Sequence, residues 1–222
     1  MGTPRRHPSG DDLVVHEWGT FTCLQDLKGR TLGSVNSDDE PVPDFVHQIS
    51  NVVRDQRSSQ SKGVASFLSN VNLRLETPVI YFHLPKGQKT ATVDVEVQFK
   101  GGWLTQYYPN ATAVAPGLLD RKLPKGPEAS TTGTLKWSKL KVGGSFSGPL
   151  TLDKVWTAPR SSKSDPVQTG QGEKEEFLFY RGLGQFQSPV TVKTAESQKE
   201  VTVEVTQRQV IRQAWLVEVD EH

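Results

Sequence analysis

Five residues in the first half of the sequence are candidate ligands for a transition metal. They are His16, Glu17, His47, Glu76 and His83. Imidazole nitrogens and carboxylate oxygens form mixed sites for divalent metal ions, which polarise a carbonyl or activate water. The five lack the spacing of a zinc motif such as His-Glu-x-x-His, so a divalent metal site requires the fold to bring them together.

Most of these candidates also have a structural interpretation. On a regular strand His16 and Glu17 point to opposite faces, so they cannot both serve one site. Arg74 and Glu76 are two residues apart and share a strand face, where an ion pair is the simplest account of both. His47 lies on the polar side of a predicted helix, where solvent is its expected partner.

A second set of candidates is aromatic. Trp103, Tyr107 and Tyr108 lie around one predicted strand and its exit. Exposed aromatic rings on a β-sheet stack on sugar rings or anchor a partner protein, whereas buried rings only pack. The sequence leaves both interpretations open, with core packing the commoner outcome.

Several other classes of function are excluded. The sequence has 26 Lys and Arg against 25 Asp and Glu, so no basic field is present to hold nucleic acid. The one cysteine, Cys23, excludes an internal disulfide and a cysteine-cluster metal site. In the segment 144–148 Phe146 occupies the position at which a nucleophile elbow needs serine. No apolar run approaches the roughly 18–20 residues of a transmembrane segment.

The elements that must position these candidates are mostly β-strands. Residues 90–99 alternate cleanly, with Val93, Val95 and Val97 pointing inward and acidic residues outward. Together with 73–84 and 103–108 they predict a three-stranded meander. Further strands are expected at 13–24, 131–142, 150–157, 176–181, 189–194, 199–206 and 214–219.

One helix is predicted, over residues 42–53, because the apolar residues of VPDFVHQISNVV recur at helical spacing. The fold class is therefore all-β and mainly antiparallel, a β-sandwich or open barrel with one short helix near 42–53. We expect residues 1–12 to be a tail that is disordered or foreign to the native protein. Residues 13–222 then form a single β-sandwich-like domain, the N-terminal part of a longer protein.

Four blocks resemble a known family. They are HEWGTF at 16–21, DDEPVPDFVH at 38–47, RLETPVIYF at 74–82 and GWLTQYYP at 102–109. In this order they resemble an uncharacterised bacterial family of hypothetical, often exported proteins, and the similarity runs from about Val14 to Trp215. The resemblance implies no activity. It implies an exported protein whose signal peptide has been removed, in the periplasm or outside the cell; without export the protein is cytoplasmic.

Two functional interpretations follow. The first is a non-catalytic β-sandwich module of a bacterial exported or envelope protein, which binds a protein or glycan partner or packs against a missing C-terminal domain. The alternative is a metal-assisted hydrolase whose site contains the five histidine and glutamate candidates.

Overall fold

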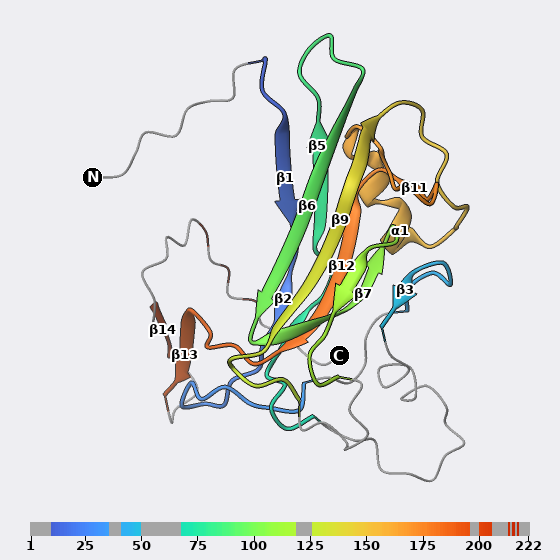
Figure 1. The fold of residues 1–222 in the computed structure, drawn as a ribbon. Helices are drawn as coiled ribbons and strands as arrows, with labels where there is room; N and C mark the ends of the chain where they lie inside the picture. Colours follow the sequence, from blue (N-terminus) through green and yellow to red (C-terminus); the bar gives the residue numbers. More distant parts are fainter. Residues whose placement is uncertain are drawn as a thin grey trace. The chain divides into compact units, whose positions relative to one another are not determined.

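The computed structural model describes residues 10–35, 41–49, 68–118, 126–195 and 200–205, with residues 213, 215 and 217. The described residues are mostly strands in mainly antiparallel sheets, with one short α-helix (Figure 1), so the all-β prediction is confirmed. No helix among them is long and apolar enough to cross a membrane.

Contacts divide the described chain into two compact units. The first contains the chain up to Leu24 and Gly33–Phe186, and the second contains Gln25–Leu32 and the chain from Gln187 onward. In the second, β13 (Val190–Thr194) and β14 (Val201–Val205) form an antiparallel pair, and the Thr194 N–H donates to the Leu27 carbonyl at 3.0 Å. The single domain over 13–222 stays a prediction.

The first unit holds a 12-stranded sheet in its described residues. Its strands are β1 (Val14–Trp18), β2 (Phe21–Thr22), β3 (His47–Gln48), β4 (Leu73–Leu75), β5 (Val79–His83), β6 (Thr90–Lys100), β7 (Gly102–Tyr108), β8 (Thr112–Val114), β9 (Thr132–Gly143), β10 (Val167–Gln168), β11 (Lys174–Glu175) and β12 (Leu178–Gly184). The main order is β1-β5-β12-β7-β9-β10-β11, and β6 and β8 pair with β9.

The strand β12 is buried on both faces, so the core of the first unit lies on both sides of it. Leu178 and Tyr180 face a cluster that contains Leu135 and Trp137 of β9, on which the half-buried valines of β6 pack. Successive strand residues point to opposite sides, so Phe179 faces a second, aromatic cluster. The layer of β5, β12 and β7 is therefore covered by β6 and β9 on one side and by a short helical segment on the other.

The predicted alternation of residues 90–99 is confirmed, because the odd-numbered residues of β6 are half-buried and the even-numbered residues are exposed. The predicted meander is wrong, since β6 pairs along its length with β9. At Gly101, whose φ is 86°, the chain turns away, and β7 pairs with β12 instead. A left-handed turn residue lets two consecutive strands join different neighbours.

The predicted helix over 42–53 is wrong in the part that the structure describes. Residues 44–46 form a turn, and β3 pairs with β7, opposite Gln106 and Tyr107. The Ile49 N–H donates to the Thr105 carbonyl at 3.0 Å, so β7 supplies a partner that a helix would have supplied internally. Residues 50–53 lie outside the described part.

The predicted strand over 150–157 is also wrong, since the helix α1 (Lys154–Thr157) begins there. The Asp153 side chain caps α1 by accepting a hydrogen bond from the Val155 N–H at 2.9 Å. A 3₁₀ helix, η2 (Pro159–Ser162), follows at once. Of the strand expected at 214–219, only residues 215 and 217 are described, and neither has strand structure.

We predict that Gly133→Ala destabilises the first unit. A Cβ atom at Gly133 would lie 2.7 Å from the Gly102 carbonyl oxygen and 2.9 Å from the Trp103 Cα atom, both of which are backbone. Overpacking of this kind costs about 1–3 kcal/mol of unfolding free energy, measurable by urea denaturation. The matched control is Gly170→Ala, where a Cβ atom meets nothing within 4 Å. Equal effects of the two substitutions would contradict the packing of β9 on β7.

Candidate functional site

The five predicted metal ligands do not form one site. The described residues contain no group of three or more His, Cys, Asp or Glu side chains that could hold a metal ion. Only His16 and His83 lie side by side, with ring centroids 5.2 Å apart. Glu17 accepts a hydrogen bond from the Tyr180 hydroxyl, on the opposite face of β1 from His16, as its position on a strand predicts.

The predicted Arg74–Glu76 ion pair is present. The Arg74 Nη2 donates to Glu76 Oε1 at 2.9 Å and to Oε2 at 3.1 Å, and both side chains are largely buried. The Arg181 side chain also donates to the Glu76 backbone carbonyl. The Glu76 carboxylate therefore serves an internal pair.

His47 has a partner that the sequence did not suggest. Its Nε2 lies 2.9 and 3.0 Å from the two carboxylate oxygens of Glu173, and Glu173 also accepts the Asn110 N–H at 2.6 Å. The imidazole stacks on Tyr107 and Tyr108. The pair ties β3 to the loop before β11. Its members are 126 positions apart in the sequence, so no local pattern reveals the pair.

The three aromatic candidates are buried. Trp103 is 1% exposed and donates its Nε1–H to the Pro116 carbonyl at 2.8 Å. Tyr107 packs in the cluster under β9, and Tyr108 packs in the aromatic cluster on the other face of the sheet. Their rings contribute to the core, which is the packing interpretation of the sequence.

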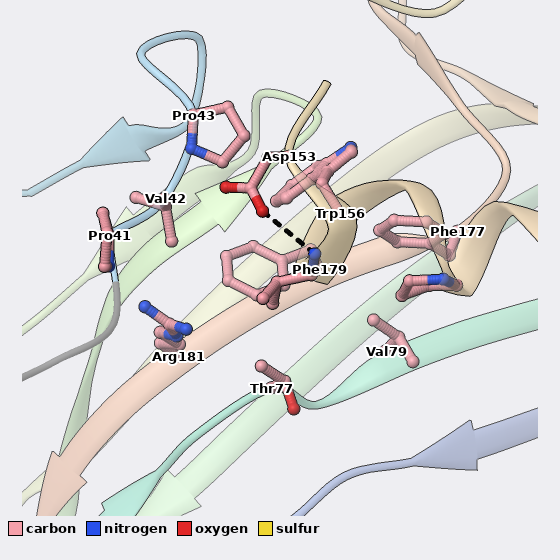
Figure 2. A pocket seen from close by; sticks show the side chains of 12 residues that line it. Pro41, Val42, Pro43, Thr77, Val79, Asp153, Trp156, Phe177, Phe179 and Arg181 are labelled. Carbon is pink, nitrogen blue, oxygen red and sulfur yellow. Dashed lines mark hydrogen bonds between the residues drawn. The ribbon is translucent and has the colours of Figure 1, made fainter. Parts of the chain in front are cut away.

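The described surface has an apolar hollow beside α1 (Figure 2). The space between its walls, counted together with the open solvent at its mouth, is about 320 Å³. The walls are Pro41, Val42 and Pro43 before β3, Thr77 before β5 and Val79 in it, Asp153, Val155, Trp156 and Pro159 around α1, and Phe177 before β12 with Phe179 and Arg181 in it. The floor is the aromatic cluster, in which the Trp156 ring lies 4.9 Å from the Phe179 ring and 5.4 Å from the Phe177 ring.

A buried carboxylate holds the helical wall of this hollow. Glu175 is fully buried, and its oxygens accept from Arg160 Nε at 2.9 Å, Arg160 Nη2 at 2.7 Å, Trp156 Nε1 at 2.8 Å and the Glu176 N–H at 2.9 Å. Four donors compensate the charge that burial would otherwise penalise. One residue of β11 thus fixes both α1, through Trp156, and η2, through Arg160.

The same arginine anchors the segment before α1. Arg160 Nη2 donates to the Pro149 carbonyl at 2.9 Å, and its guanidinium lies 5.2 Å from the centre of the Phe146 ring. Between these anchors and Asp153, Leu150 is 99% exposed and Leu152 is 98% exposed. Two leucines in the segment between Pro149 and Asp153 therefore project into solvent from a backbone that is anchored at both ends.

Comparisons with known proteins found no matching family model, no matching curated protein and no matching solved structure.

We predict that Glu175→Gln lowers the free energy of unfolding by about 3–5 kcal/mol, because Arg160 is left beside the core without its charged partner. Chemical denaturation followed by tryptophan fluorescence measures the loss. Glu96→Gln is the matched control, because Glu96 is exposed on β6 and its substitution should change stability by less than about 0.5 kcal/mol. A small effect at Glu175 would show that this pair does not secure α1.

We also predict that none of the four tyrosines ionises in the folded protein at the usual pH of about 10. Burial raises the pKa of Tyr81, Tyr107 and Tyr180, and burial with the charge of Glu173 raises that of Tyr108 to about 12. Since unfolded tyrosines lose their protons first, stability falls as the pH rises above about 10. Tyrosinate absorbance should follow unfolding seen by circular dichroism. Tyrosine ionisation near pH 10 while the protein stays folded would show that these side chains are not buried as described.

Proposed function

We propose that this chain is a non-catalytic β-sandwich module that binds an apolar segment of a partner protein in the hollow beside α1. The observation that carries the proposal is the combination of an apolar hollow with two leucines, Leu150 and Leu152, that are almost fully exposed in the segment that leads to Asp153 of its wall. Monomeric proteins rarely expose contiguous apolar surface without a binding role. In line with the family resemblance, we place the module in a bacterial exported or envelope protein.

The lining favours a protein partner over a glycan. Sugar rings need exposed aromatic faces with several polar groups around them, whereas the aromatic rings at the hollow are largely buried and its walls are mostly proline, valine and phenylalanine. Two of its polar side chains already serve the fold: Asp153 caps α1, and Arg181 donates to the Glu76 carbonyl. An apolar peptide side chain is the complement of such walls.

The hydrolase alternative has less support. Two of its five residues are engaged in internal pairs with oppositely charged or titratable side chains, Glu76 with Arg74 and His47 with Glu173. Glu17 is engaged by Tyr180. Only His16 and His83 remain together, and they lie on β1 and β5 rather than in the hollow.

The experiment is a selection from a random dodecapeptide library displayed on phage, followed by anisotropy titrations of the enriched peptides. We predict enrichment of peptides with large apolar anchors. The double substitution Leu150→Ser with Leu152→Ser should weaken their binding at least about tenfold, because each leucine loses its apolar contact area. Both residues are exposed, so the variant should fold normally.

The matched control is Val114→Ser, which removes an exposed apolar side chain of β8 that does not line the hollow. It should leave peptide binding unchanged. A library that yields no apolar peptide, or peptides that bind both variants equally, would overturn the proposal. Binding on a glycan array alone, or turnover of ester or peptide substrates that His47→Gln abolishes, would instead favour one of the other interpretations.

A further inference from the structure

The two histidines that lie side by side occupy neighbouring strands at one edge of the sheet. In the antiparallel register of β1 and β5, Val14 is opposite His83 and His16 is opposite Tyr81. Residues opposite each other share a face, and so do residues two apart, so both imidazoles project from one face of the sheet. His16 is exposed and His83 is half-buried.

Each imidazole contacts the other and has no hydrogen bond or ion pair within the described part of the chain. His47, by comparison, has its Nε2 engaged by Glu173. A neutral imidazole has one nitrogen lone pair that can bind a metal ion. Two such rings on one face therefore present two free nitrogen ligands to the same volume of solvent.

The separation of the rings fits a shared ion. Zinc–nitrogen bonds of about 2.0–2.1 Å, added to about 1.1 Å from nitrogen to ring centre, place each ring centre about 3.2 Å from the ion. At a tetrahedral angle the two ring centres are then about 5.2 Å apart. The centroids of His16 and His83 are 5.2 Å apart. Rotation about the Cβ–Cγ bond turns the nitrogens while the ring centre stays nearly in place, so both lone pairs can be aimed at one point.

We propose that His16 and His83 form a two-imidazole site for a divalent transition-metal ion of the zinc and nickel class. Imidazole ligands favour these ions over calcium and magnesium, which prefer oxygen. The site is independent of the peptide site proposed above. It differs from a five-residue metal centre, because water or a donor from another molecule completes the coordination.

The bound ion would cross-link an edge strand. Among the described strands β1 pairs only with β5, and its side chains from Val15 to Trp18 are exposed. A ligand that binds the folded state and not the unfolded state stabilises it by mass action. Metal binding to His16 and His83 therefore holds β1 on the sheet and protects its backbone amides from hydrogen exchange.

The test is isothermal titration of the untagged full chain with Zn²⁺ and, separately, Ni²⁺. We expect one ion per chain. Loss of an outer-shell partner of a metal ligand costs about 10–100-fold in affinity, and loss of a ligand itself should cost at least as much. His16→Gln and His83→Gln should therefore each weaken metal binding at least about tenfold. His47→Gln is the matched control and should leave the affinity unchanged. Mg²⁺ should give no binding.

A measurement on the unmodified chain keeps the proposal falsifiable if a variant fails to fold. In NMR spectra of the five histidine side chains, Zn²⁺ should shift the His16 and His83 ring signals together, and the β1 amides should exchange more slowly. Shifts confined to other histidines, equal affinities for all variants, or one ion bound per two chains would overturn the proposal. Absence of any saturable binding would do the same.

Discussion

The buried carboxylate of Glu175 is the interaction on which the candidate site depends. A charge without exposure to water is tolerated only when donors replace the water, and here Arg160, Trp156 and a backbone N–H supply them. The two side-chain donors come from α1 and η2, which total only eight residues and cannot be stable by themselves. Satisfying one carboxylate therefore fixes the position of a helical layer on the sheet.

The hollow follows from this constraint. Trp156 is held by its indole nitrogen, so its ring stands among Phe45, Phe177 and Phe179 and forms part of the floor. Arg160 reaches back to the Pro149 carbonyl and leaves the neighbouring leucines in solvent. Polar side chains here serve the fold, whereas the accessible surface is apolar. This division of roles is the physical basis for proposing a binding module rather than a hydrolase.

Part of this arrangement could be predicted from the sequence. Period-two spacing correctly gave the alternation of β6 and the Arg74–Glu76 pair, because both depend only on local strand geometry. The helix over 42–53 failed since its apolar spacing also suits an extended chain, for which β7 offers backbone partners. Glu175 lies in a polar stretch of the sequence that predicts a surface loop. No pattern among its sequence neighbours indicates that a charged residue there is buried.

Hydrogen exchange of the tryptophan indole N–H groups, followed by NMR, tests most directly whether one buried carboxylate secures the helical wall. The Trp156 Nε1–H, 2.8 Å from Glu175, should exchange only when the first unit unfolds, whereas that of Trp18, whose side chain is 69% exposed, should exchange at once. Exchange of the Trp156 indole as fast as that of Trp18, in an otherwise folded protein, would show that α1 opens freely and would contradict the account.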